Sequence, residues 1–181
     1  MDNDVFWYVL FAANGKVRKL KPYLEENKIE IFFPEYYIER KIPGKNTTKK
    51  ILNPVISNLI FVRSSKIILD PILKEIKLRL NIVSDLYYRD RGSKEIIIVP
   101  DMQMHNFIKV AGKTEEQIIY IPNEEVDLKK GTKVKVTGGV FRGAEGVLMR
   151  IKGDKRVVVS IPNLFAVATA YLPAQFIEII E

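Results

Sequence analysis

The stretch Gly131–Gly146, which reads GTKVKVTGGVFRGAEG, decides the fold of the C-terminal part of this chain. From residue 133 to 137 polar side chains alternate with valines, and this period of two predicts a strand with one apolar face. The Gly-Gly pair at 138–139 permits the positive φ angles of a tight turn. Gly143 and Gly146 allow the chain to reverse and pass close to its neighbour before a second apolar run begins. The stretch therefore predicts a strand hairpin with an aromatic, basic tip.

This hairpin resembles the KOW motif, a small barrel module of transcription and ribosome factors. The alternative is an SH3-like barrel hairpin with no particular partner, and the intact glycine spacing favours the KOW motif. Five short strands are expected, at 133–137, 146–152, 155–161, 167–172 and 175–180. That number suits a small barrel, so we expect an SH3-like β-barrel KOW domain over residues 127–181. The alanine-rich stretch 163–172 is compatible with a strand or with a helix.

The N-terminal part predicts strands interspersed with helices. Val5–Phe11 is an unbroken apolar run, which is typical of a central strand buried on both faces. After it we expect a helix over Lys16–Asn27, a strand from Ile29 interrupted at Pro34, an extended hairpin over 35–62, a helix from Asp70, strands at 82–88 and 95–99, and a helix from Asp101. This order is typical of a ferredoxin-like split βαβ sandwich of the α+β class, in which helices pack on an antiparallel sheet.

Charge divides the chain into three segments. Residues 1–110 carry a net charge of +6, residues 111–126 carry −3, and residues 127–181 carry +4. This pattern predicts two basic domains, at 1–111 and 127–181, joined by an acidic linker at 112–126, in which a short strand at 117–121 is an open alternative. A basic balance favours nucleic acid or a nucleoprotein machine as partner, although solvated lysine faces produce the same balance.

Composition excludes several classes of function. The chain has no cysteine and a single histidine, His105, so we expect no disulfide, no metal centre and no histidine-based catalytic cluster. No nucleophile is paired with a base and no glycine-rich phosphate loop follows a strand, so we expect a binding protein without a cofactor rather than an enzyme. The apolar runs are too short to span a membrane, and residues 1–4 lack the basic region of a signal peptide. These features predict a cytoplasmic protein.

Four segments resemble the NusG family of transcription elongation factors, in the family's order. They are FWYVLFAANGKVRKLKPYLEENKIEIFFPE at 6–35, NPVISNLIFVR at 53–63, IVPDMQMHNF at 98–107, and the KOW half at 131–161. Together they cover most of the chain. The resemblance implies an N-terminal NusG domain followed by a KOW domain, and a monomeric factor that binds RNA polymerase and suppresses pausing or termination.

One departure from the family pattern narrows this expectation. Where the family commonly has proline-glycine-aromatic, this chain has Ser57, Asn58 and Leu59, and Ile56 stands where an aromatic residue is frequent. The apolar character is kept, but the aromatic ring is lost. This difference favours a specialised paralogue of the RfaH or UpxY kind, the latter being antiterminators of capsular polysaccharide operons, over the housekeeping factor.

The resemblance implies that an apolar patch of the first domain docks on the clamp helices of RNA polymerase. The side chains expected to form this patch are Tyr8, Phe33, Ile56, Leu59 and Phe61, with Trp7 as a further candidate. Core packing is the alternative for each of them, and it is favoured for Trp7 and Phe61. Because side chains alternate along strands, only about half of these residues can face outward.

A basic hairpin tip is the best nucleic-acid candidate. It carries Arg40, Lys41, Lys45, Lys49 and Lys50, and in the family this hairpin lies near the upstream DNA fork. Such residues would neutralise phosphate charge and make binding depend on salt. The alternative is a solvated edge whose lysines prevent strand-to-strand aggregation. For a second basic cluster, at residues 16–21, the solvated face is favoured.

The KOW hairpin is expected to recruit a further partner. In the family this partner is Rho or a ribosomal protein of the small subunit, and the candidate contact residues are Phe141, Arg142 and Phe165. The alternative is that both phenylalanines cap the ends of the barrel. A second hypothesis for the whole chain is an RNA-binding or ribosome-associated KOW protein, which would bind RNA tightly without polymerase.

Overall fold

The structure is a computed structural model that describes residues 4–44, 46–56, 58–113, 118–122, 131–161 and 164–180. The chain forms two compact units, of which the first comprises Met1–Pro34 and Pro54–Asp101 and the second Glu35–Asn53 and Met102–Glu181. Residues 102–111, expected in the first domain, are thus grouped by their contacts with the second unit. The domain bounds themselves stay a prediction.

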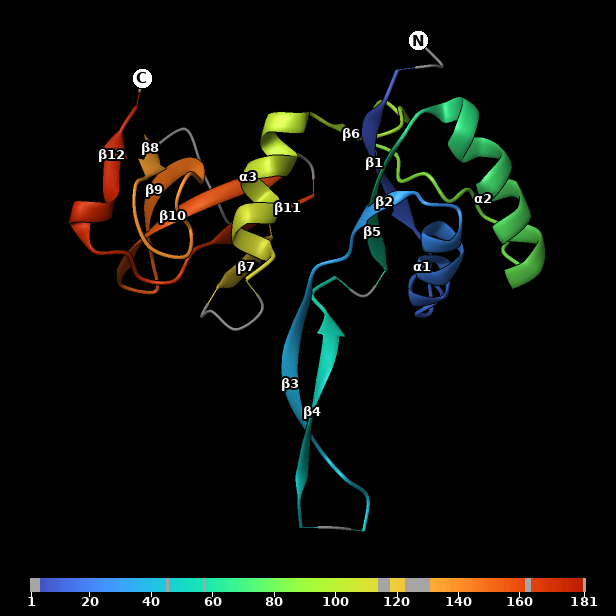
Figure 1. Ribbon diagram of the computed structural model, residues 1–181, viewed down its shortest axis with the longest axis horizontal. Helices are drawn as coiled ribbons and strands as arrows, with labels where there is room; N and C mark the ends of the chain where they lie inside the picture. The colour runs from blue at the N-terminus through green and yellow to red at the C-terminus, as the bar shows by residue number, and fades with distance from the viewer. Residues whose placement is uncertain are drawn as a thin grey trace. The chain divides into compact units, whose positions relative to one another are not determined.

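The first unit contains a four-stranded antiparallel sheet in the order β2-β5-β1-β6 (Figure 1). Its strands are β1 (Phe6–Phe11), β2 (Glu30–Phe32), β5 (Leu59–Ser64) and β6 (Ile98–Val99). β1 occupies a central position because its apolar side chains can be buried on both faces. This is the strand order of the split βαβ fold, so the fold class expected from the sequence is confirmed.

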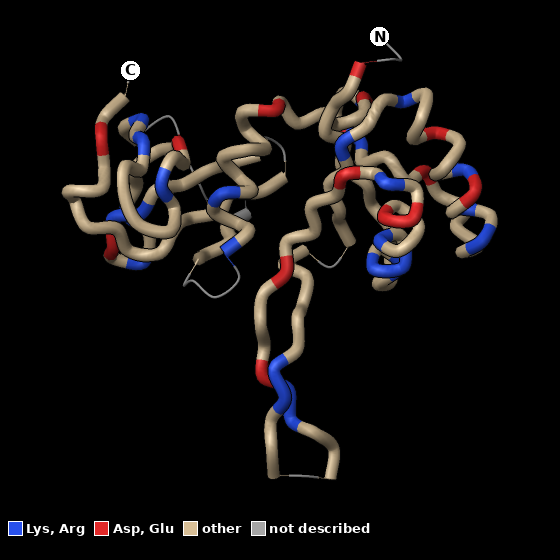
Figure 2. The backbone as a smooth tube through the Cα atoms, viewed as in Figure 1, with Lys and Arg blue, Asp and Glu red and all other residues tan. Residues whose placement is uncertain are grey.

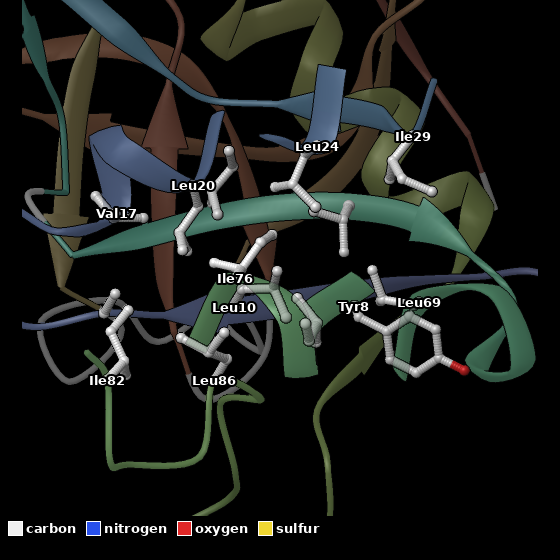
Figure 3. Close-up of a cluster of buried hydrophobic side chains, with 14 residues drawn as sticks. Tyr8, Leu10, Val17, Leu20, Leu24, Ile29, Leu69, Ile76, Ile82 and Leu86 are labelled. Atoms are coloured by element: carbon white, nitrogen blue, oxygen red, sulfur yellow. The ribbon is translucent and has the colours of Figure 1, made fainter. Parts of the chain in front are cut away.

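Helices α1 (Val17–Glu26) and α2 (Lys66–Leu80) cover one face of this sheet. α1 buries Val17, Leu20 and Leu24 and α2 buries Leu69, Leu73 and Ile76, each at helical spacing. Figure 3 shows how these side chains meet those of β1 and β5 in one core. α2 begins four residues before the predicted start at Asp70; Ser65, in an extended conformation, stands at the N-cap position, and Pro71 is accommodated inside the helix.

The segment after α2 differs from the prediction of two strands at 82–88 and 95–99. Only β6 is a regular strand there, and isolated bridges join Leu10 to Tyr87 and Arg89 to Ile96. Ile82 and Leu86 are buried in the core, but of residues 82–88 only Tyr87 forms a bridge, to Leu10, so the segment lacks the pairing of a regular strand. A turn at 90–93 follows, in which the Asp90 carboxylate accepts hydrogen bonds from the backbone of Gly92 and Ser93 at 2.9 and 2.8 Å.

The second unit contains a six-stranded antiparallel sheet in the order β12-β8-β9-β10-β11-β7. The strands are β7 (Ile119–Pro122), β8 (Thr132–Val136), β9 (Glu145–Ile151), β10 (Asp154–Ile161), β11 (Phe165–Ala168) and β12 (Ile177–Ile179), and the short 3-10 helix η3 (Ala174–Phe176) precedes β12. The strand-rich C-terminal part is therefore confirmed. The strand predicted at 167–172 lies earlier, at Phe165–Ala168, because Phe165 pairs with Ile161 at the end of β10.

Helix α3 (Asp101–Ala111) packs against strands of the second unit through its residues from Met102 onward. The Phe107 ring lies 5.3 Å from the Phe165 ring, edge to face. The Lys109 ammonium donates to the Gly143 carbonyl at 2.8 Å, and the Glu145 backbone donates to Asn106 Oδ1 at 3.1 Å. These bonds attach the helix to the end of the turn between β8 and β9.

The remaining element of the second unit is a two-stranded hairpin of β3 (Glu35–Lys41) and β4 (Thr48–Pro54). Within the part of the chain that the structure describes, no helix is long and apolar enough to cross a bilayer. No cluster of three metal-ligating side chains occurs among those same residues.

Candidate functional site

The residues predicted to form one docking patch lie on two opposite faces of the first sheet. In the antiparallel register Tyr8 is opposite Val62, whereas Phe61 is opposite Val9 and Leu59 is opposite Phe11. Directly opposed side chains share a face and neighbours along a strand alternate between faces. Tyr8 therefore lies on the face covered by α1 and α2, and Leu59 and Phe61 lie on the other face.

Tyr8 belongs to the core. Its side chain is 2% exposed, and its ring packs edge to face against Phe6 at 6.3 Å and Tyr87 at 5.4 Å. Phe33 packs partly buried against the same core. The expectation that Tyr8 is exposed is thus wrong. Side chains along β1 alternate between the two faces of the sheet, and that of Tyr8 points toward α1 and α2. Trp7 is also buried, in agreement with the core packing that the sequence favoured for it.

On the opposite face, Leu59 and Phe61 are buried as well, at 7% and 0% exposure. The Phe61 ring lies 6.3 Å from that of Phe32 on β2. Ile56, which precedes β5, is half-buried and so remains accessible to a partner. Their role in docking stays a prediction, and Ile56 is the accessible member of this group.

Arg63 lies on the same face as Phe61 and was not singled out by the sequence. Its guanidinium contacts Asp101 at 3.4 Å and Glu30 at 3.7 Å. The hydrogen bond to Asp101 and the charges of both carboxylates raise the pKa of Arg63 despite partial desolvation. The side chain is thereby held beside the apolar residues of β5. The pairing of β2 with β5 brings Glu30 opposite Arg63, which the linear sequence does not reveal.

The β3–β4 hairpin has a regular register. The Ile42 backbone donates to the Thr47 carbonyl at 3.1 Å near the tip, and the Val55 backbone donates to the Pro34 carbonyl at 2.9 Å near the base. Both bonds imply the same pairing, so Arg40 faces Lys49 and Glu39 faces Lys50. Adjacent residues of one strand lie on opposite faces, so each face of the hairpin carries basic residues.

The basic side chains of the hairpin are accessible. Arg40, Lys41, Lys49 and Lys50 are all exposed, and none of them forms an ion pair with any residue that the structure describes. Figure 2 shows the blue segments of both strands side by side toward the far end of the hairpin. Lys45 lies outside the described residues. The structure thus brings four of the five predicted nucleic-acid residues together.

The hairpin also exposes apolar side chains that the sequence analysis did not assign to a site. Tyr36, Tyr37 and Leu52 are 38%, 47% and 41% exposed. Asn53 Nδ2 donates to the Tyr36 hydroxyl across the strands at 3.4 Å. The signal in the sequence was the adjacent pair of tyrosines beside a basic tip, since aromatic faces can stack on nucleic-acid bases.

The tip between β8 and β9 presents a smaller surface than expected. Phe141 is buried at 2% exposure, and Phe165 is buried against Phe107, so both phenylalanines are packing residues here. Of the two alternatives left open by the sequence, exposure or packing, the structure shows packing for both rings. Arg142 is exposed, and so is its neighbour Val140.

Glycines determine the shape of this turn, as predicted. Gly143 has a φ of +82°, and its amide donates to the Val136 carbonyl at 2.7 Å. A Cβ atom on Gly146 would lie 2.5 Å from the Val158 carbonyl oxygen of the neighbouring strand. A side chain at either position would therefore strain the turn or separate the strands.

Two comparisons with known proteins bear on this arrangement. The sequence profile of a family described as "Transcription termination factor nusG" matches residues 6–108, more than half of the chain. A solved structure described as "Domain interaction in Thermotoga maritima NusG" is similar over 98% of this chain and 98% of that chain, at 19% sequence identity and a TM-score of 0.46. The profile match includes the first sheet, both of its helices and the β3–β4 hairpin.

Proposed function

This chain belongs to the NusG family of transcription elongation and termination factors, and from that premise we propose that it binds RNA polymerase and suppresses pausing or termination. The family consists of transcription factors rather than enzymes, which agrees with the sequence analysis. The single observation that carries the proposal is the basic hairpin inside the matched segment. Its four described cations are exposed and without ion pairs among the described residues, as a surface for a polyanion would be.

The surface of this protein that docks on the clamp helices of the polymerase begins at Ile56 and continues along β5. Ile56 is half-buried, while Leu59 and Phe61 provide the apolar side chains behind it. Arg63, fixed by Asp101 and Glu30, lies on the same face and gives it a polar rim. An apolar centre with a charged rim is the usual anatomy of a protein interface.

The hairpin contacts nucleic acid at the transcription bubble. Arg40, Lys41, Lys49 and Lys50 would neutralise phosphates, and the exposed rings of Tyr36 and Tyr37 would stack on unpaired bases. This chemistry gives binding that weakens with salt and depends little on sequence. A role limited to one operon, as in the RfaH and UpxY kind, rests on residues 57–59 and would add sequence selectivity.

The tip of the second unit recruits a further factor, either Rho or a ribosomal protein. Its accessible residues are Val140 and Arg142, because Phe141 and Phe165 are packed inside. Binding of the wild type to purified Rho and to the small ribosomal subunit, compared with that of Arg142→Glu, would show which partner uses this tip. A factor of this kind acts on polymerase, so we place it in the cytoplasm.

The main test is single-round transcription with purified RNA polymerase. Wild type should shorten pauses, and Ile56→Asp should abolish the effect, because a carboxylate buried in an apolar interface is desolvated without a partner. Ile68→Asp is the matched control, since Ile68 on α2 is 54% exposed and lies outside the proposed surface. Leu59→Asp is a weaker choice because Leu59 is buried and a carboxylate there would disturb folding.

The same assay separates the two hypotheses for the chain. If wild type changes no pause on either a generic template or its native leader sequence, and binds RNA tightly without polymerase, the polymerase proposal is wrong and the RNA-binding alternative takes its place. If Ile56→Asp and Ile68→Asp are equally active, polymerase binding does not use the β5 surface.

A further inference from the structure

The C-terminal half of α2 and the loop that follows it line an open pocket of about 410 Å³ in the first unit. Its floor is apolar and is formed by Leu73, Ile82 and Leu86, which belong to the core. Figure 3 shows Ile82 and Leu86 close together at one end of that core. A pocket of this volume is large enough for a bulky apolar side chain and its neighbours.

The walls of this pocket are fixed by hydrogen bonds. Asn81 ends α2 in the left-handed conformation, and the following Ile82 amide donates to the Lys77 carbonyl at 2.9 Å. The Lys16 ammonium donates to the Asn81 carbonyl at 3.1 Å. On the other side, the Tyr87 hydroxyl donates to Asp70 at 2.6 Å. The pocket is therefore preformed, and the protein would lose little conformational entropy when a ligand fills it.

Some charged groups around the pocket already have an ion partner in the described part of the chain, and others have none there. Of the two carboxylates, Asp85 forms an ion pair with Arg89 at 2.9 Å, whereas Asp70 accepts a hydrogen bond from the neutral Tyr87 phenol and keeps its negative charge. The two lysines in the lining, Lys74 and Lys77, form no ion pair with any described residue. The charges of the lining that have no ion partner among these residues are thus two positive ones and that of Asp70, and this positive excess favours a ligand with carboxylates.

Exposed apolar side chains lie beside the opening. Leu78 forms part of the lining and is 77% exposed, and Val83, next to Ile82, is 93% exposed. Large apolar side chains gathered at the mouth of an apolar pocket are typical of an interaction site. This site lies on the helix-covered face of the sheet, opposite the face that carries Leu59 and Phe61.

We propose that this pocket binds an amphipathic, acidic helix of a second protein. One large apolar side chain of that helix fills the space above Leu73, Ile82 and Leu86, and a second packs on Leu78. Carboxylates one turn away from the first anchor pair with Lys74 and Lys77. Because the two faces of the sheet are distinct, the site is independent of the proposed polymerase surface and permits both partners to bind together.

The test uses a displayed library of helical peptides of about 16 residues, which make four to five turns. The library is selected against the full-length protein, and the affinities of the enriched peptides are then measured by calorimetry. The enriched sequences should carry Leu, Phe or Met with Asp or Glu one turn away. Lys74→Glu combined with Lys77→Glu should weaken their binding about tenfold or more, and so should Leu78→Asp.

A matched charge control is Lys19→Glu combined with Lys152→Glu, at two exposed positions outside the pocket, and it should leave the affinity unchanged. Leu78 is so exposed that its substitution should not impair folding, which a thermal melt would verify. The proposal is overturned if no peptide is enriched, if the enriched peptides lack carboxylates, or if they bind the pocket variants as tightly as wild type. None of these results would affect the transcription assay.

Discussion

Two pairs of antiparallel strands in this protein have the same backbone arrangement and opposite side-chain environments. β1 and β5 bury most of their residues, whereas β3 and β4 bury only Pro54 at the end of β4. In the first pair the sequence is constrained by packing, since each side chain must fill a defined volume. In the second pair the sequence is constrained chiefly by the backbone hydrogen bonds between the strands, so the side chains are available for contact with other molecules.

The largest effect should come from matched truncations in the two pairs. Leu10→Ala removes a fully buried side chain of β1 and should lower the free energy of unfolding by about 2–5 kcal/mol. Leu52→Ala on β4, where the side chain is 41% exposed, should change it by less than about 1 kcal/mol. Urea denaturation of both variants measures the difference. Equal losses of unfolding free energy would show that the hairpin is packed in solution and that the two strand pairs do not differ in this respect.

A smaller effect is expected when the hairpin loses its charge. Replacing Arg40, Lys41, Lys49 and Lys50 by Gln should weaken binding to single-stranded DNA roughly tenfold or more and reduce the salt slope by about 0.7 for each phosphate that is no longer neutralised. The measurement is fluorescence anisotropy over a salt series. A matched set of exposed lysines, Lys19, Lys133, Lys152 and Lys155, also changed to Gln, provides the control.

An equal loss of affinity in both sets would mean that net charge, and not the hairpin, attracts the nucleic acid. Unchanged binding in the hairpin set would favour the alternative in which these lysines only protect a strand edge from aggregation.

The smallest expected effect is on the pH dependence of stability, through a tyrosine packed in the first unit. Burial, together with the hydrogen bond to Asp70, raises the pKa of Tyr87 above its ordinary value. A raised pKa in the folded state means that the neutral phenol stabilises the fold. This contribution is complete below the unfolded pKa of about 10 and is lost as the pH rises above it. Tyr87→Phe should therefore lose less stability than wild type between neutral and strongly alkaline pH.

Denaturation curves over this range measure the effect, with Tyr36→Phe in the exposed hairpin as the matched control. If Tyr87→Phe and wild type lose stability in parallel, the phenol of Tyr87 does not contribute to the alkaline transition.

Periodicity in the sequence was enough to predict most of the elements and the fold class. The apolar run at 5–11 and the glycines of 138–146 correspond to β1 and to the turn after β8, because these signals are local. Local signals do not fix which face of a strand meets the helices. Tyr8 and Leu59 were therefore assigned to one patch, although the pairing of β1 with β5 separates them.

Long-range contacts also explain the other differences. Ile82 and Leu86 have the residue types of a strand and are buried in the core, but of residues 82–88 only Tyr87 forms a bridge, to the distant Leu10. For Phe141 at the hairpin tip and Phe165 on a later loop the sequence left exposure and packing open; both are buried, and Phe165 packs against Phe107, which is distant in the sequence. The Arg63 cluster arises from three segments, and no spacing in the sequence indicates it.

The uninterrupted register of the β3–β4 hairpin has a consequence for how this protein can diversify. No bulge lies between the Pro34–Val55 bond and the Ile42–Thr47 bond, so cross-strand pairs can be removed or added two at a time without exchanging the faces of the remaining residues. Each such change would alter the reach of the tip by about 7 Å. The length of the hairpin, and with it the reach of its tip, can therefore evolve separately from the packed sheet.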